Sequence, residues 1–234
     1  MTAIDIDNIR KTFGNVTAVD IPELKIEKGD LVGLVGNNGA GKTTFLRLLL
    51  DLSRPDEGAA TLHGVNPRLS EEWKAWTGAV IHDGFPIDSL SPKEYFDFIA
   101  RIDGIPVGEL SERIEQLHSL TGDELLSTPT LIRNLSAGNR QKVGIVAALI
   151  NHPRIVILDE PFNFLDPSSQ EALKRLLTDY NRTTGATIIV SSHNLQLVTD
   201  ISTRLLVMDH GSIVKDIIND SPSAAEELRE YFAG

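Results

Sequence analysis

The stretch LVGLVGNNGAGKTTFLRLLLDL, residues 31–52, joins an apolar run to a glycine-rich loop and then to a segment of helical composition. The apolar run at 31–36 is typical of a strand buried on both faces, and the helical segment stops before Pro55. Between them the spacing G-x-x-x-x-G-K-[ST] is formed by Gly36, Gly39, Gly41, Lys42 and Thr43. A glycine-rich loop between a buried strand and a helix N-terminus predicts a phosphate-binding site.

The groups of this loop suit a nucleotide's phosphates and a magnesium ion. Glycines let backbone N–H groups approach phosphate oxygens closely, Lys42 offers a positive charge to the terminal phosphates, and the Thr43 hydroxyl reaches Mg²⁺. A chance glycine-rich turn is the alternative, and the neighbouring strand and helix argue against it. We therefore expect cofactor contacts from Gly36, Asn37, Asn38, Gly39, Ala40, Gly41, Lys42, Thr43 and Thr44.

A second apolar run, IVILDE at 155–160, ends in two carboxylates. Asp159 is suited to hold Mg²⁺, directly or through water, and Glu160 to polarise a water molecule that attacks the γ-phosphate. Such a pair alone would fit a solvated strand end equally well. The phosphate-binding loop makes the catalytic interpretation the better one.

Composition limits the class of protein. The chain has 234 residues, of which 41% are hydrophobic and 24% charged, as in an ordinary globular protein. It has no cysteine, which excludes disulfides and thiolate metal sites and permits a cytosolic location. A net charge of −11 argues against a broad nucleic-acid surface and against adsorption to anionic lipid. We expect neither a signal peptide at the N-terminus nor a membrane span, since runs such as 143–150 are too short.

The order of predicted elements indicates a sheet domain with an insertion. Residues 1–30 alternate in hydropathy and predict short antiparallel strands. Residues 85–152 are helical in pattern, beginning with a capping box at Ser91 and Glu94. Strands then alternate with helices, which implies a parallel sheet. We divide the chain into 1–84 (the β subdomain and the first part of the core), 85–152 (the helical insertion), 153–220 (the second part of the core) and 221–234 (a short C-terminal helix).

A second possible anion site lies in NLSAGNRQ, residues 134–141. Ser136, a small residue and Gly138 lead directly into a predicted helix, whose free N–H groups and positive end attract an anion. Because the loop at 36–44 already provides a phosphate site, a second one about a hundred residues later requires an explanation.

Six motifs in this order resemble those of the ATP-binding subunits of ABC transporters, over about residues 3–218. They are Phe13 in KTFG, the loop at 36–44, the signature LSAGN at 135–139, the acidic strand at 155–160, FLD at 164–166 and His193 in SSHN. The resemblance implies that Phe13 stacks on adenine, that His193 reaches the γ-phosphate and that Asp166 contacts an opposite subunit. Taken singly, Phe13 would fit a core position, His193 a helix start and Asp166 a helix N-cap.

The resemblance also implies a fold and a mode of action. The fold is α/β, a P-loop NTPase (RecA-like) core with a mainly parallel sheet, an N-terminal antiparallel β subdomain and an inserted all-helical subdomain. Two subunits of this family pack head to tail, so Ser136 and Gly138 would contact ATP held by the partner's loop, which explains the second anion site. In the hydrolysis of ATP the catalytic residues would be Lys42, Glu160 and His193. The residues that bind Mg²⁺ would be Thr43, Asp159 and Asp83.

The implied partners are a second ATPase subunit, identical or closely related, and a separate membrane-spanning transporter subunit, with no nucleic acid. That membrane subunit would hold the chain at the cytoplasmic, inner face of the membrane. Residues 89–105, SLSPKEYFDFIARIDGI, resemble exporters more than solute importers. Two alternatives stay open: a soluble single-domain ABC ATPase acting in cofactor assembly or another non-transport process, and another P-loop ATPase or kinase, against which the signature and His193 argue.

Three positions depart from the family pattern. Ala137 replaces the first glycine of the signature, and Asn139 is one methylene shorter than the usual glutamine. The loop that usually offers a glutamine to Mg²⁺ corresponds to IHDGFP, 81–86, where Asp83 is the matched residue and His82 the one-residue-shifted option. Asp83 could hold Mg²⁺ through water, although its charge opposes that of a triphosphate.

Two aromatic residues are candidates for a contact with the membrane subunit. In this family a cleft between the sheet core and the helical insertion receives a short helix from that subunit, and we expect Phe85 and Phe96 to line it, as apolar anchors for a helix. The alternative is that both belong to the insertion's own core. The 3.6-residue spacing of Tyr95, Phe98, Ile99 and Ile102 predicts a buried face for the helix that carries them.

Overall fold

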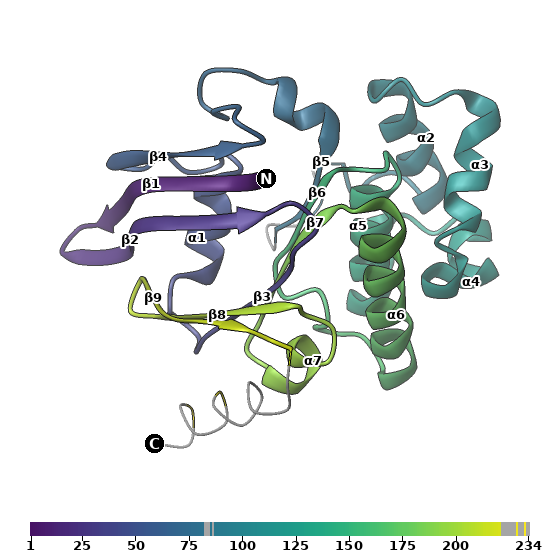
Figure 1. Cartoon of the computed structure of the whole chain (residues 1–234). Coiled ribbons are helices and arrows are strands. Elements are labelled where there is room, and N and C mark those ends of the chain that lie inside the picture. Colours follow the sequence, from purple (N-terminus) through teal and green to yellow (C-terminus); the bar gives the residue numbers. More distant parts are fainter. Residues whose placement is uncertain (82–84, 86, 221–227, 229–231, 233–234) are drawn as a thin grey trace.

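Two β-sheets and a set of helices form the part of the chain that the computed structural model describes, residues 1–81, 85, 87–220, 228 and 232 (Figure 1). The smaller sheet is antiparallel, with strands in the order β2 (Val16–Glu27), β1 (Thr2–Phe13) and β4 (Glu57–Leu62). The larger sheet has the order β5 (Thr77–Val80), β6 (Ile155–Leu158), β7 (Thr187–Ser192), β3 (Leu31–Val35), β8 (Arg204–Asp209) and β9 (Ser212–Ile218). Its first five strands are parallel and β9 pairs antiparallel to β8.

The helices follow the same chain order. α1 (Lys42–Leu49) comes directly after β3, and between β5 and β6 lie α2 (Pro92–Ile102), α3 (Val107–Glu115), α4 (His118–Ser127) and α5 (Ala137–Leu149). α6 (Pro167–Thr184) and α7 (Leu195–Thr199) flank β7, and two short 3₁₀ turns are η1 (Glu72–Trp76) and η2 (Ile132–Asn134). The α/β architecture predicted from the sequence is therefore confirmed, including the antiparallel N-terminal sheet and the helical insertion. The exact division at residues 84, 152 and 220 stays a prediction.

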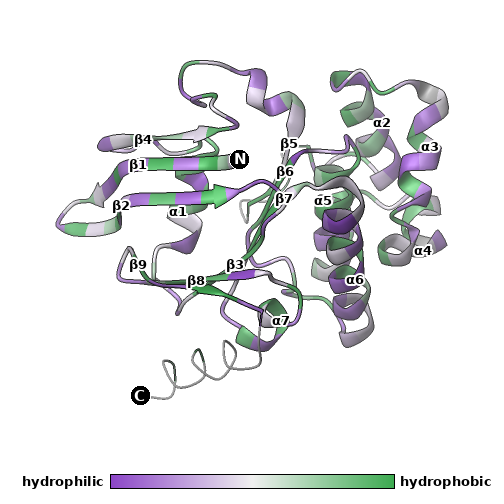
Figure 2. Ribbon diagram, in the orientation of Figure 1, coloured by the Kyte–Doolittle hydropathy of each residue, from purple (hydrophilic) through white to green (hydrophobic). Residues whose placement is uncertain are grey.

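The central strand β3 separates two apolar cores, because successive side chains of a strand point to opposite faces. Leu31 and Val35 face a core shared with α5 and α6. Val32 and Leu34 face a core shared with α1 and the smaller sheet. Figure 2 shows the hydrophobic colouring concentrated on the central strands. All five residues of β3 are buried, so the loop that follows it starts from a fixed position.

Side-chain caps fix the starts of two helices as the sequence predicts. At α2, Ser91 Oγ accepts from the Glu94 N–H (3.4 Å) and Glu94 Oε2 accepts from the Ser91 N–H (2.8 Å), which is a capping box. At α6, Asp166 Oδ1 accepts from the Ser169 N–H at 3.0 Å. Ser223 and Glu226 predict a further capping box for the C-terminal helix, and both lie outside the described residues.

The predicted buried face of α2 is partly wrong. Tyr95 is buried and Ile99 half-buried, but Phe98 is 38% and Ile102 66% exposed, whereas Phe96 is completely buried. Pro92, Tyr95, Phe96 and Ala100 form the buried face, at the i, i+3, i+4 spacing of a helix. Because the apolar residues of α2 surround most of its circumference, their spacing alone did not fix which side faces the core.

Candidate functional site

The loop between β3 and α1 is held tightly against neighbouring backbone. A side chain at Gly36 would place its Cβ 2.3 Å from the Met208 carbonyl oxygen, and one at Gly41 would meet the Ala18 carbonyl oxygen at 2.3 Å. Gly41 also has φ of +106°, a conformation that favours glycine. The glycines of the motif therefore allow the loop to pass between β8 and β2. The same loop and helix start also contain the other predicted contact residues, Asn37, Asn38, Gly39, Ala40 and Thr44.

Lys42 lies at the start of α1 and is buried, and its ammonium group folds back over the loop. Lys42 Nζ donates to the Gly36 carbonyl at 2.6 Å and lies 3.5 Å from Glu160 Oε1. A cation in this place can balance the charge of phosphates held by the loop.

A hydrogen-bonded carboxylate joins the loop to the sheet. Asp159, at the end of β6, is 1% exposed. The Thr43 hydroxyl donates to Asp159 Oδ2 at 2.7 Å, and the Ser191 hydroxyl of β7 donates to Asp159 Oδ1 at 2.6 Å. The donor set consists of a hydroxyl and a carboxylate oxygen, and Mg²⁺ prefers such oxygens together with substrate phosphates. Thr43 and Asp159 therefore fit a magnesium site of the kind predicted.

Glu160 is held by three residues, which come from β7, the loop after β7 and α1. Its backbone has φ of +48°, and its N–H donates to Ser191 Oγ at 2.8 Å. Its Oε2 lies 2.9 Å from His193 Nδ1, beyond the end of β7, and its Oε1 faces Lys42. The carboxylate thus lies between the loop lysine and the histidine.

Ser191 is a functional candidate that the sequence interpretation missed. Its hydroxyl is completely buried, donates to Asp159 and accepts from the Glu160 N–H, so it positions both acidic residues. The signal available in the sequence was its place at the end of an apolar strand, two residues before His193. Its significance depends on β6 and β7 being neighbours, which only the fold supplies.

Phe13 is exposed at the end of β1 rather than buried in a core. The side chain is 55% exposed, and Lys11 Nζ lies 5.3 Å from the centre of its ring. Because Ala18 of the adjoining strand touches the loop at Gly41, the smaller sheet borders the phosphate loop. An exposed aromatic face on this sheet is compatible with stacking on a base.

The signature residues line a separate hollow. Ser136 is the N-cap of α5 and accepts from the Asn139 N–H at 3.2 Å. A Cβ at Gly138 would approach the Phe164 carbonyl oxygen to 2.6 Å. The described residues that line this hollow are Ser136, Ala137, Gly138, Asn139, Lys142, Phe164, Leu165 and Asp166, and none of them comes from the loop at 36–44.

Asp166 both caps α6 and borders this hollow. The hydroxyls of Ser168 and Ser169 and the Ser169 N–H donate to it, and these bonds hold the pKa of the Asp166 carboxyl well below its ordinary range. Asp83 and His82, the remaining metal candidates, lie outside the described residues.

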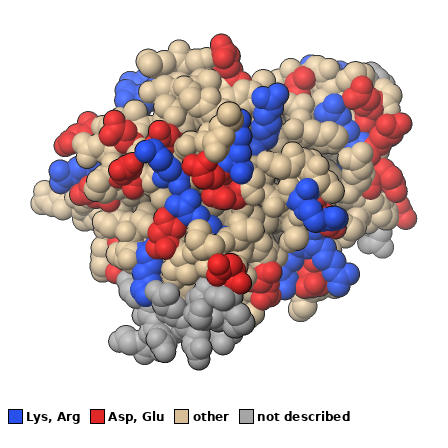
Figure 3. All heavy atoms as spheres, in the orientation of Figure 1, with Lys and Arg blue, Asp and Glu red and all other residues tan. Residues whose placement is uncertain are grey.

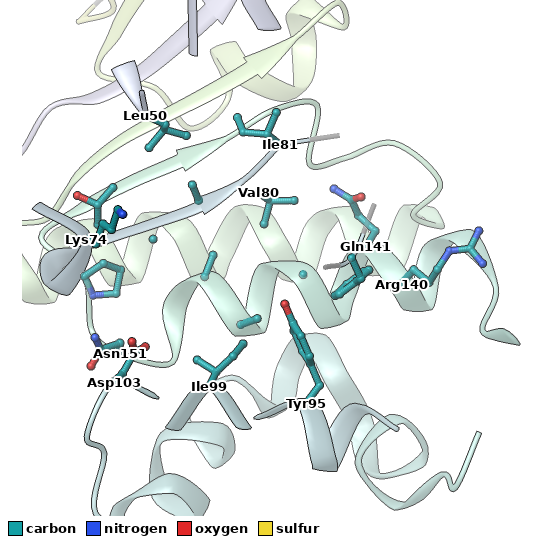
Figure 4. A pocket seen from close by; sticks show the side chains of 18 of the residues that line it. Leu50, Lys74, Val80, Ile81, Tyr95, Ile99, Asp103, Arg140, Gln141 and Asn151 are labelled. Carbon is teal, nitrogen blue, oxygen red and sulfur yellow. The ribbon is translucent and has the colours of Figure 1, made fainter. Parts of the chain in front are cut away.

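A large groove lies between β5, α2 and α5 (Figure 4). Its volume is about 810 Å³, and its walls include Val80, Phe85, Tyr95 and Ile99. Phe85 is half-buried and packs edge-on against Tyr95, with ring centres 5.3 Å apart. Phe96 is not among the lining residues and belongs to the core, so the prediction that it lines this cleft is wrong.

Comparisons with known proteins agree on one family. The family model described as ABC transporter matches residues 19–163. The methionine import ATP-binding protein MetN of Halalkalibacterium halodurans is 34% identical over 91% of this chain and 65% of its own length. MetN 3 of Shouchella clausii is 32% identical over 98% of this chain and 70% of its own length. The chain thus spans about two thirds of the length of these relatives.

Solved structures share the fold. The bacterial ABC transporter cassette MJ0796, solved as a dimer, superposes with a TM-score of 0.84 at 24% identity, covering 93% of this chain and 99% of that one. Its post-hydrolysis state bound to ADP and Pi gives a TM-score of 0.83 at 23% identity, again over 93% and 99% of the two chains.

Proposed function

Since this chain belongs to the ABC transporter family, we propose that it is the Mg²⁺-dependent ATP-hydrolysing subunit of a membrane transporter. Family membership confirms the resemblance predicted from the motifs and supports the proposed ATPase activity. The observation that carries the proposal is the environment of buried Asp159. Its carboxylate accepts hydrogen bonds from the hydroxyl of Thr43, beside the phosphate loop, and from the hydroxyl of Ser191 in β7.

The proposed roles of the site residues follow from their geometry. The loop amides and Lys42 hold and neutralise the terminal phosphates, and Thr43 and Asp159 supply oxygens for Mg²⁺, which screens the developing charge when bound. Glu160 orients the attacking water and accepts its proton, since Ser191 fixes its backbone N–H and His193 holds its carboxylate. The same bond supports the proposed role of His193 toward the γ-phosphate, and the exposed ring of Phe13 supports its proposed role as a surface for adenine.

We further propose that ATP is closed in by two chains. The signature hollow at Ser136 and Gly138 contains no residue of the phosphate loop among the described residues that line it, so one chain supplies two separate half-sites. A head-to-tail pair would bring each signature over the other chain's loop. The free N–H groups at the start of α5 would then face the γ-phosphate. No helix among the described residues is long and apolar enough to cross a membrane.

The groove beside Phe85 is the proposed contact with that membrane subunit, which would place the chain at the inner face of the membrane. Export rests on the resemblance of residues 89–105 alone. The relatives named above are methionine import proteins and do not support export. Uptake and efflux assays in vesicles that contain the complete transporter, with methionine among the tested solutes, decide the direction.

The activity is tested with the purified chain and Mg-ATP. Lys42→Ala should abolish productive ATP binding or hydrolysis, because it removes the charge aimed at the phosphates. Lys93→Ala is the matched control, since Lys93 lies on the surface and pairs only with Asp97 at 2.8 Å among the described residues. Unchanged steady-state hydrolysis in Lys42→Ala would remove the basis of the proposal. A chain that hydrolyses ATP and never copurifies with a membrane protein would favour the alternative role in cofactor assembly.

A further inference from the structure

We propose that the groove binds a partner helix in one direction, with the helix N-terminus at Asp103 and its C-terminus at Arg133 and Arg140. The inference rests on the proposed function, since the helix belongs to the membrane subunit. It adds the direction and the charge of that helix, which are set by residues of this chain.

The shape of the groove suits a short helix. Tyr95, Ile99 and Asp103 follow one another at four-residue intervals along one side of α2 and at its C-cap. The opposite wall is α5, where Gly144, Ala147 and Ala148 present little side-chain bulk. From Tyr95 to Asp103 is about 12 Å along a helix, so two to three turns of a partner helix can lie against this row of small residues.

The two ends of the groove carry opposite charge (Figure 4). Asp103 and Asn151 lie at one end, and Arg140 and Gln141 at the other. Lys74 also borders the Asp103 end but is paired with Glu71 at 3.1 Å, while Asp103 has no cationic partner among the described residues. With the Lys74–Glu71 pair counted as neutral, this end carries the one negative charge of Asp103.

The opposite end is positive. Arg140 lies beside Arg133, since its Nη1 is 3.4 Å from the Arg133 carbonyl oxygen. Within the described part of the chain neither guanidinium has an acidic partner, and the carboxylate of Asp88 is the one acidic group lining this end. Two cations against one anion leave an excess of positive charge. On the face shown in Figure 3, by contrast, acidic and basic groups are interspersed.

The direction follows from the helix macrodipole. A helix carries partial positive charge at its N-terminus and partial negative charge at its C-terminus, where carbonyl oxygens have no partners within the helix. With the N-terminus at Asp103 and the C-terminus at the two arginines, both ends meet opposite charge. The reverse direction places like charges together at both ends. A basic side chain in the first turn of the helix, or an acidic one in the last, strengthens the same choice.

The absence of cysteine in the chain allows a direct test of direction. Asp103→Cys and Arg133→Cys are each labelled with a short photo-crosslinker in the chain purified with its membrane subunit from detergent-solubilised membranes. Ile102→Cys is the matched control, because Ile102 neighbours Asp103 but is not among the groove-lining residues. Peptide mass spectrometry then locates each crosslink in the partner.

We expect both groove variants to crosslink to one segment, with the Arg133→Cys product several residues C-terminal to the Asp103→Cys product, and no product from Ile102→Cys. The reverse order overturns the inference. If the partner copurifies but neither groove variant reaches it, the groove is not the docking site and the inference falls while the proposed function stands. If no membrane subunit copurifies even with the unmodified chain, both fall.

Discussion

The Thr43 hydroxyl and the Ser191 hydroxyl donate to the two oxygens of one carboxylate. Thr43 donates to Asp159 Oδ2 at 2.7 Å, and Ser191 donates to Asp159 Oδ1 at 2.6 Å. Thr43 is the first residue after the loop lysine, and Ser191 lies near the end of a strand nearly 150 residues later. Asp159 therefore couples the phosphate loop to the strand that leads to His193 through these two hydrogen bonds. This coupling makes Ser191 a positioning residue for the metal and for Glu160.

Ser191→Ala should weaken the site without changing its charge. The variant removes one donor to Asp159 and leaves the Glu160 N–H without its acceptor, which should lower the free energy of unfolding by about 1–3 kcal/mol. Loss of a group that orients a metal ligand typically costs about 10–100-fold in metal affinity or activity. We expect the Mg²⁺ concentration for half-maximal ATPase activity to rise accordingly.

Ser192→Ala is the control for this measurement, since the Ser192 hydroxyl is buried next to it but accepts only from the Asn194 N–H among the described residues. Its Mg²⁺ dependence should stay that of the unmodified chain. If Ser191→Ala has the same Mg²⁺ dependence as the control, Ser191 does not act through Asp159.

Glu160→Gln should bind ATP and lose turnover. The amide keeps the size of the side chain next to His193 but cannot accept the proton of water, and loss of a general base costs roughly 10²–10⁴-fold in rate. With ATP and Mg²⁺ the variant should accumulate as a dimer in sizing chromatography, because the shared site closes and cannot reset.

Glu171→Gln, on the exposed side of α6 and paired with Lys174 and Arg175, serves as control and should retain both turnover and the unmodified elution volume. A Glu160→Gln chain that stays monomeric at high concentration with saturating Mg-ATP would count against closure by two identical chains. Mixing with a second, different ATPase subunit would then be required to form the dimer.

The sequence predicted those parts of the site that short-range patterns encode. An apolar run, a glycine-rich loop and a capped helix are local signals, so the positions of Gly36 and Lys42 followed from spacing, and Asp159 followed from an apolar run taken together with that loop. Ser191 carries no such signal, because a serine at a strand end is unremarkable until β6 and β7 lie side by side. Phe96 was misplaced for a related reason: α2 has apolar residues around most of its surface, and the direction of the core depends on how it packs on α4 and α5.

Gln141→Met should raise stability slightly. The Gln141 side chain is buried, and its Nε2 has no acceptor among the described residues, so the folded state carries a desolvated donor. Methionine has similar length and no polar group, so we expect the free energy of unfolding to rise by about 1 kcal/mol. Denaturant unfolding, read as a higher midpoint with an unchanged slope, is the measurement.

Gln170→Met provides the opposite case, since Gln170 Nε2 donates to the Phe162 carbonyl at 3.2 Å. We expect the free energy of unfolding of this variant to fall by about 0.5–1.5 kcal/mol. A fall in the stability of Gln141→Met as large as that of Gln170→Met would mean that Gln141 has a partner in solution.

Phe85→Ser and Phe96→Ser should separate docking from core packing. Phe96 is completely buried among α2, α4 and α5, and truncating such a side chain costs about 3–5 kcal/mol, so we expect a large fall in melting temperature. Phe85 is half-buried at the edge of the groove and contacts Tyr95, so its loss should lower the melting temperature much less. Recovery of the membrane subunit should fall sharply for Phe85→Ser, with ATPase activity of the isolated chain retained.

Phe98→Ser is the control, because it makes the same change at a residue that belongs to neither the core nor the groove. Phe98 is partly exposed and is not among the groove-lining residues. It should retain its membrane subunit and nearly all its stability. If the melting temperature of Phe85→Ser were as low as that of Phe96→Ser, and its partner were lost only in proportion to unfolding, Phe85 would be assigned to core packing and not to docking. Normal recovery of the membrane subunit by a stable Phe85→Ser chain would instead show that this aromatic edge of the groove lies outside the contact.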